Sequence, residues 1–343
     1  MYVKKNIYIV FVLMKNLYFC CNKYIRDIMS TANNDRNQMT YEKAIALRES
    51  GKPLSKKQIW EITDLGYDYY YGKRGKVKRD PEKGVELFTI AAERGDAVAQ
   101  FDLGLAYDDG VGVEEIDWEK AAYWYERAAK GGEINAMFNL AVLLKMGLVG
   151  FGSKEKRDRE QDKRLAVYWL RKVAKRGDIN AISLLGKSYF FGDGVRRNRP
   201  LGFKMMQQAA EQGYGPAQYD LSLRYHHGDY VEKDFDKEFF WLQKAVENGY
   251  SMAYNNLGVC YSLGRGTQID HDKAFALYKK AIRCTYMNEE AANNLAICYE
   301  NGEGVEPNPR EALRWYRRAK RWGKERLEED IERMKRAVAA QPR

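Results

Sequence analysis

The chain has 343 residues, of which 45% are hydrophobic and 31% are charged, a composition typical of soluble proteins. Its formal charge of +10 divides into +4 over residues 1–28, zero over 29–309 and +6 over 310–343. A body that binds nucleic acid would gather Lys and Arg along one face, so this distribution argues against nucleic acid as a partner.

Residues 1–38 are interpreted as an N-terminal leader. Lys4 and Lys5 precede an apolar run over 7–14, which Lys15 interrupts. The run is too short to span a bilayer, and no small-residue cleavage site follows it. The composition changes at Met29, which favours translation from Met29 and a cytoplasmic protein. The alternative is that residues 1–28 are a genuine signal and the protein is exported.

Short amphipathic segments flank the central part of the chain. Residues 39–58, which begin MTYEKAIALRES, predict an N-terminal capping helix. In residues 324–343, Leu327, Ile331, Met334 and Val338 recur at helical spacing and predict a C-terminal capping helix. The positive charge of this last helix leaves open a contact with an acidic partner or nucleic acid.

Residues 59–323 repeat one pattern seven times. The clearest copy begins at Ala99, passes through Leu103, Gly104 and Tyr107, and ends at Gly132. At steps of 36 to 45 residues, the repeated leucines are Leu65, Leu103, Leu140, Leu185, Leu221, Leu257 and Leu295.

The pattern predicts a helical hairpin in each copy. Ala, Leu, Gly and Tyr at i, i+4, i+5 and i+8 lie on one side of a helix, and the small residue after Leu lets two backbones approach. The Gly-x-Gly-Val segment ends this helix with a left-handed residue. An Asp or Asn, such as Asp80, Asp234 or Asp270, begins the second helix. Because one hairpin cannot bury both of its faces, the copies must stack into an all-α solenoid.

The third copy departs from the pattern. Leu144 replaces its tyrosine, the Gly-x-Gly-Val turn is missing, and about eight residues are added around 153–164. The added segment is strongly charged and predicts a solvated loop or an extension of a helix.

Seven copies in register resemble the Sel-1-like repeat family, a relative of the tetratricopeptide repeats. This resemblance implies a right-handed α/α superhelical solenoid with capping helices at both ends. It also implies that the first helix of each hairpin lines a concave groove. Members of the family are mostly adaptors in multiprotein complexes, and many are bacterial.

No pattern in the sequence indicates an enzyme, a cofactor or a metal site. The histidines are His226, His227 and His271, and adjacent histidines on a helix point in different directions. The chain lacks a CxxC pair, and Cys260 and Cys298 occupy the same place in successive repeats, which favours free buried thiols in a reducing compartment.

Two sets of positions are candidates for contact with a partner in the groove. The residue before the repeated leucine is polar in six copies: Asp64, Asp102, Asn139, Asp220, Asn256 and Asn294. The residues after the repeated tyrosine vary between copies, and the candidates among them are Tyr70, Tyr71, Asp108, Phe190, Phe191 and His226.

Carboxylates and amides can bond the backbone of an extended peptide, and aromatic residues often anchor an interface. The alternatives are that the polar residues bond the neighbouring repeat and that one member of each aromatic pair packs in the core.

We therefore expect a non-enzymatic scaffold or adaptor that binds a protein or peptide in the groove. The alternative is an exported repeat protein that binds a cell-wall fragment or neutralises a toxin, which requires residues 1–28 to be a signal. The sequence does not name the partner.

Overall fold

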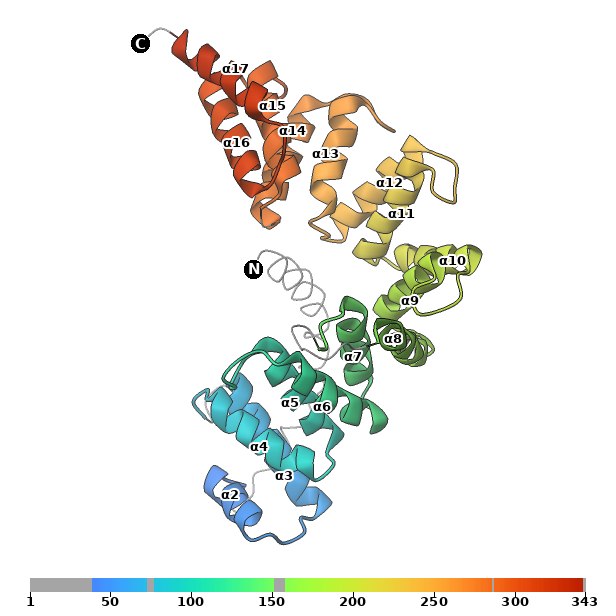
Figure 1. Ribbon diagram of the computed structural model, residues 1–343, viewed down its shortest axis with the longest axis vertical. Helices are drawn as coiled ribbons and strands as arrows, with labels where there is room; N and C mark the ends of the chain where they lie inside the picture. Colours follow the sequence, from blue (N-terminus) through green and yellow to red (C-terminus); the bar gives the residue numbers. More distant parts are fainter. Residues whose placement is uncertain (1–38, 73–76, 151–157, 286, 342–343) are drawn as a thin grey trace. The chain divides into compact units, whose positions relative to one another are not determined.

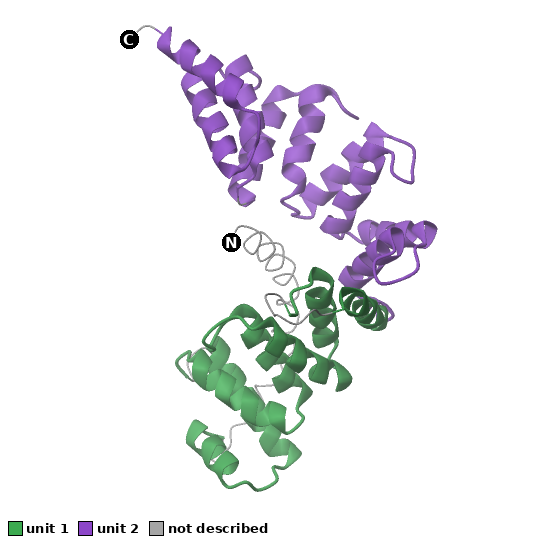
Figure 2. Cartoon of the chain, in the orientation of Figure 1, with its two compact units in different colours: residues 1–173 green, residues 174–343 purple. Residues whose placement is uncertain are grey.

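The computed structural model describes residues 39–72, 77–150, 158–285 and 287–341 (Figure 1). Within these ranges it contains sixteen α-helices and no strands, which confirms the predicted all-α class. The predicted leader over 1–38, with its possible start at Met29, lies outside the described residues. The chain divides into two compact units, 1–173 and 174–343, so each is described by itself (Figure 2).

Unit 1 holds a short first helix followed by hairpins. The helices are α2 (Tyr41–Glu49), α3 (Lys56–Tyr71), α4 (Pro81–Glu93), α5 (Ala97–Asp109), α6 (Trp118–Lys130), α7 (Ile134–Met146) and α8 (Arg159–Ala174), which ends at the unit boundary. Helices α3 and α4 pair, as do α5 and α6, and α2 packs on α4. The predicted capping segment 39–58 therefore contains α2, a connection and the first residues of α3.

Unit 2 repeats the same hairpin and ends with a single helix. Its helices are α9 (Ile179–Phe191), α10 (Arg199–Glu211), α11 (Gly215–His227), α12 (Phe235–Glu247), α13 (Ala253–Leu263), α14 (His271–Cys284), α15 (Glu289–Asn301), α16 (Pro309–Trp322) and α17 (Glu328–Ala339). Each helix packs against the next along the chain. Leu327, Ile331 and Met334 are buried with Tyr316, so α17 covers the apolar side of α16.

The second helices begin where the sequence places a polar cap. Asp117 accepts a hydrogen bond from the Lys120 backbone N–H at 2.9 Å. Asp270 accepts the equivalent bond from Lys273, also at 2.9 Å. These bonds satisfy backbone donors that a helix start leaves without an intrahelical acceptor.

The two glycines of the Gly-x-Gly turn have different structural roles. Gly110 ends α5 in the left-handed region, with φ of 68°. Gly112 presses on the preceding repeat, because a Cβ there would lie 2.5 Å from the Pro81 carbonyl oxygen. In unit 2, Gly266 and Gly304 meet the start of the preceding second helix in the same way. In these three copies the turn therefore packs against the hairpin before it.

The glycine after the repeated leucine makes room mainly for a side chain. A Cβ on Gly104 would lie 2.6 Å from Tyr125 Cδ1, and one on Gly258 would lie 2.7 Å from Tyr278 Cε1. In the fourth copy the glycine after the leucine, Gly186, does face the backbone of the second helix, because a Cβ there would lie 3.0 Å from the Gly202 carbonyl oxygen. The prediction that the small residue after the leucine lets two backbones approach is therefore wrong for Gly104 and Gly258, where a tyrosine ring of the second helix fills the space.

The charged insertion of the third copy divides into two parts. Residues 151–157 lie outside the described residues, whereas 159–164 form the first turns of α8. Arg159 Nη1 donates a 2.9 Å hydrogen bond to the Val149 carbonyl. This part of the insertion therefore extends a helix. None of the described helices is both long and apolar enough to cross a membrane.

Candidate partner-binding surface

A row of polar side chains links the first helices of the hairpins in unit 2. We call it the polar row, and it consists of Lys187 on α9, Tyr219 and Asp220 on α11, Asn255 and Asn256 on α13, and Asn294 on α15. All six residues are half-buried. Each of these four helices contributes at least one of them.

Direct contacts connect the members of the polar row. Lys187 Nζ lies 2.6 Å from Asp220 Oδ2. Asn256 Nδ2 donates to the Tyr219 hydroxyl at 3.2 Å. Asn255 accepts from Asn294 Nδ2 at 3.0 Å and donates to Asn256 Oδ1 at 3.4 Å.

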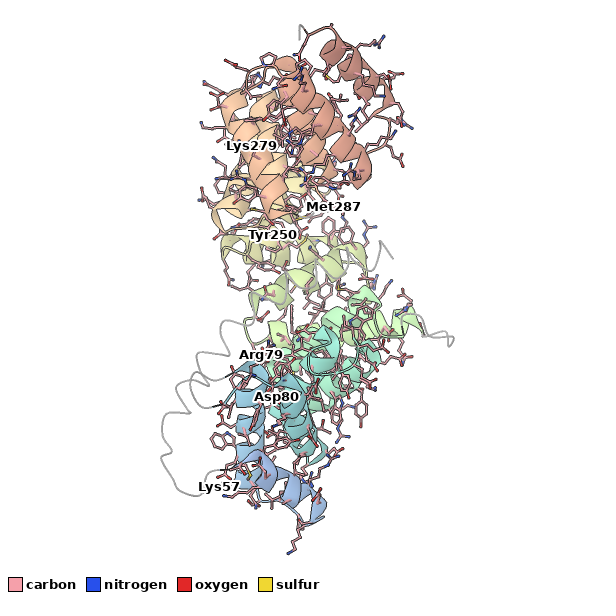
Figure 3. All side chains as sticks on the ribbon, turned by 90° about the vertical axis from the view of Figure 1, so that its left-hand side faces the viewer. Lys57, Arg79, Asp80, Tyr250, Lys279 and Met287 are labelled. Carbon is pink, nitrogen blue, oxygen red and sulfur yellow. The ribbon has the colours of Figure 1, made fainter. Side chains whose placement is uncertain are left out.

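The repeat pattern explains where the row lies. Asp220, Asn256 and Asn294 each precede a repeated leucine, and those leucines are buried. Successive residues of a helix point about 100° apart, so a residue next to a core leucine lies at the edge of the buried face. The Tyr219 ring packs 5.5 Å from that of Tyr250, which is labelled in Figure 3. Burial raises the pKa of Tyr219, so its hydroxyl stays protonated at neutral pH.

In unit 1 the corresponding candidates lie deeper. Asp102 and Asp108 are buried, and Asn139 is only 7% exposed. The buried Tyr125 hydroxyl donates to Asp108 Oδ2 at 3.0 Å and accepts from Asn139 Nδ2 at 3.3 Å. The prediction that these three residues face a partner is corrected: Asp108 and Asn139 instead hold α5, α6 and α7 together, and Asp102 is not at the surface.

The aromatic candidates separate into core and surface members. Tyr70 is 5% exposed, with its ring 5.6 Å from that of Phe88, and Phe190 is 1% exposed. These two residues therefore leave the set of candidate contacts, because packing already covers them. Tyr71 is half-buried against Tyr67, with ring centroids 4.4 Å apart. Phe191 is 56% exposed and remains available to a partner.

His226 is half-buried between the two helices of one hairpin. Its Nδ1 lies 2.9 Å from Glu238 Oε1 on α12, and its ring packs edge-on against His227. This contact ties α11 to α12 and does not favour a role in binding a partner. Within the described ranges, no three His, Cys, Asp or Glu side chains gather as they would to hold a metal ion.

Sequence reasoning missed three members of the polar row. Lys187, Tyr219 and Asn255 do not occupy the position before the repeated leucine. The sequence feature that could have identified them is their position on a first helix, next to a repeated polar or small residue of the pattern. Only the spatial alignment of successive helices shows that their side chains meet.

Stacked helical hairpins with a polar row on their first helices define an α-helical repeat protein. A model of the family described as Sel1 repeat matches residues 62–96, 97–133, 134–178, 179–214, 215–250, 251–286 and 289–321. These matches cover well over half of the chain, and the chain belongs to the Sel1 repeat family. Sel1 repeats are generally non-catalytic and generally mediate protein–protein interaction.

Solved structures support the same fold. A Sel1 repeat protein from Oxalobacter formigenes is 27% identical with a TM-score of 0.64, over 88% of this chain and 83% of that one. A protective antigen of uropathogenic Escherichia coli, c5321, is 29% identical with a TM-score of 0.63, over 83% of this chain and 57% of that one.

Among curated proteins, an F-box protein of Arabidopsis thaliana is 35% identical over 88 residues, which are 26% of this chain. The match spans only 22% of the length of that relative. The similarity therefore does not extend over the whole relative.

Proposed function

We propose that this chain is a non-enzymatic adaptor that binds an extended segment of a partner protein along the polar row of unit 2. The observation that carries the proposal is the continuity of half-buried amide, carboxylate and hydroxyl groups over four first helices. Such a row presents donors and acceptors at several points along one direction, which a peptide backbone can match.

The amides retain hydrogen-bonding capacity beyond their mutual contacts. An Asn side chain carries two N–H donors and an oxygen with two lone pairs. The bonds between Asn255, Asn256 and Asn294 use part of this capacity and also fix the side-chain orientations. Preorganised groups lose less conformational entropy when a ligand binds.

An apolar anchor lies near one end of the row. Phe191 follows Lys187 by four residues on α9, so the two side chains lie on the same side of the helix. The Phe191 ring is exposed and lies 5.4 Å from the Arg224 guanidinium. A partner segment with an apolar side chain at this end gains burial that the polar row alone does not supply.

The proposed compartment is the cytoplasm. Cys260, Cys284 and Cys298 are free thiols, which suits a reducing environment. Fractionation of the source cells tests this proposal, because recovery of the protein outside the cytoplasm would contradict it. An N-terminal mass that shows residues 1–28 on the mature protein would separately contradict translation from Met29.

The binding test compares three versions of the full chain in affinity capture from the source cells. The first is the parent, and the second carries Asn255→Ala, Asn256→Ala and Asn294→Ala. The third is a control in which the same number of amides on second helices is removed. The control substitutions are Gln207→Ala, Gln208→Ala and Gln243→Ala. Circular dichroism confirms that each version is folded.

We expect the parent and the control to retain the same partner and the Asn variant to lose it. Hydrogen exchange of the purified complex should then show protection in α11, α13 and α15. Equal retention by all three versions, or protection confined to second helices, would refute the polar row as the binding surface.

A further inference from the structure

A hollow lined by arginines lies at the C-terminal end of unit 2 and shares no residue with the polar row. Its volume is about 410 Å³, and α16 supplies all of its lining except Val338 of α17. We call it the arginine hollow. Its lining residues are Arg310, Leu313, Arg314, Arg317, Arg318, Arg321 and Val338.

Helix geometry aligns the charges. Arg310, Arg314, Arg317 and Arg321 recur at i, i+4, i+7 and i+11, so they form one stripe on the surface of α16. At 1.5 Å per residue the stripe is about 16 Å long. All four residues are exposed, and helix α17 lies beside α16 in this end of the unit (Figure 1).

Few carboxylates pair with the arginines of the stripe. Arg314 lies 3.3 Å from Glu311, an exposed pair that contributes little. Arg310, Arg317 and Arg321 form no ion pair with any described residue. Two acids of α17 have closer partners, since Glu328 pairs with Lys320 and Glu332 pairs with Lys335, each at 2.6 Å. Arg317 makes only a smaller electrostatic contribution to the lowered pKa of Glu332.

The floor of the hollow is apolar. Leu313 is buried and Val338 is half-buried. Arg318 lies across the rings of Trp315 and Trp322, at 5.2 and 5.0 Å from their centroids. These contacts hold the Arg318 side chain along an apolar surface and orient its guanidinium.

We propose that the arginine hollow binds an acidic amphipathic helix of a protein partner. The arginine stripe matches carboxylates spaced at i, i+4, i+7 and i+11 on that helix, and arginine pairs bidentately with carboxylates. The Leu313 and Val338 floor takes an apolar side chain of the same helix. Nucleic acid is the less favoured ligand, because its phosphates do not use an aliphatic floor. The site is separate from the polar row and does not depend on the adaptor function proposed above.

The test measures binding of two dye-labelled helical peptides to the full chain by fluorescence anisotropy. One peptide carries Glu at the four stripe positions with Leu beside them, and the other carries Gln in place of Glu. Arg317→Glu with Arg321→Glu reverses the charge of the hollow. Lys204→Glu with Arg283→Glu changes the net charge equally at exposed positions of α10 and α14.

We expect the Glu peptide to bind the parent and to bind less tightly as salt rises. The Arg317/Arg321 variant should bind about ten-fold more weakly or worse, a loss of about 1.4 kcal/mol, whereas the Lys204/Arg283 variant should change less than two-fold. Val338→Ala should weaken the Glu peptide but not a version without Leu. Circular dichroism checks that each variant is folded.

Four outcomes would overturn the proposal. They are no binding of the Glu peptide at low salt, equal binding of the Gln peptide, equal losses in the two charge-reversal variants, and tighter binding of a DNA or RNA oligonucleotide than of the Glu peptide.

Discussion

Replacing Gly258 with Ala tests the packing rule inside each hairpin. The added Cβ would lie 2.7 Å from Tyr278 Cε1 and 2.9 Å from Cδ1, closer than side chains approach in folded proteins. Alanine favours a helix over glycine by about 1 kcal/mol. Overpacking a buried site costs about 1–3 kcal/mol, and Tyr278 is only 3% exposed. We therefore expect the substitution to destabilise the protein by about 0–2 kcal/mol, the overpacking cost less the helix gain.

A double-mutant cycle isolates the steric part of this effect. In Tyr278→Leu the ring is absent, so Gly258→Ala should instead stabilise by about 1 kcal/mol. The difference between the two backgrounds, about 1–3 kcal/mol, is the coupling energy. Two other copies already lack both the glycine and the tyrosine. Ala141 occurs with Leu170, and Ser222 occurs with Leu242, in the positions of Gly258 and Tyr278.

Urea unfolding of the four proteins, followed by circular dichroism, gives the free energies if the slopes agree. Stabilisation of the parent by Gly258→Ala, or a coupling energy below about 0.5 kcal/mol, would refute the reasoning. Ala296 with Tyr316 shows that one copy accommodates a Cβ beside a tyrosine. A small coupling would mean that Tyr278 can shift in the same way.

Two further predictions concern buried groups. Tyr125→Phe should destabilise the protein by about 2–3 kcal/mol, because it removes a buried hydroxyl that bonds a carboxylate and an amide. The control Tyr123→Phe, on the surface, should change the unfolding free energy by less than about 0.5 kcal/mol. Equal urea midpoints for the two variants would contradict this prediction. At pH 8 a maleimide should label Cys284 and spare Cys260 in peptide mass spectra, since burial raises the pKa of Cys260 to about 12. Rapid maleimide labelling of Cys260 in the folded protein would contradict its burial. As the pH rises above the ordinary thiol pKa of about 9, Cys260 loses its proton in the unfolded chain but keeps it in the folded protein, so its contribution to the free energy of unfolding declines.

Periodicity was sufficient to predict the hairpins because each repeated position has a local cause. The Asp270 cap and the left-handed Gly110 depend on residues within one turn of the helix end, so sequence alone identifies them. The start of α3 at Lys56 was not predicted, because the capping box of Ser55 and Gln58 lies before the repeat pattern begins.

The candidate site was harder to predict because burial depends on neighbouring repeats. Asn139 and Asn256 occupy equivalent positions, yet Asn139 bonds the buried Tyr125 hydroxyl and Asn256 bonds the half-buried Tyr219. The difference arises from which tyrosine each copy supplies, on the second helix in one case and on the neighbouring first helix in the other. A single repeat pattern does not encode that choice.

One departure from the Gly-x-Gly turn could have been read from the sequence. Tyr230 stands in the place of the second glycine and keeps a left-handed φ of 79°. Its ring lies 5.3 Å from that of Phe203 on the preceding second helix and is 43% exposed. The Tyr230 side chain therefore contacts the preceding second helix, which in other copies packs against the backbone of the second glycine.

Contact between Gly112 and Pro81 has a consequence for how the array can change during evolution. The turn that a copy carries is shaped to fit the copy before it, so a duplicated hairpin brings a surface matched to its former neighbour. Gain or loss of a complete repeat preserves this match, whereas a break inside the turn destroys it on both sides. A harmful substitution in one turn should accordingly be compensated in the preceding hairpin, and families of such chains should differ in length by whole repeats.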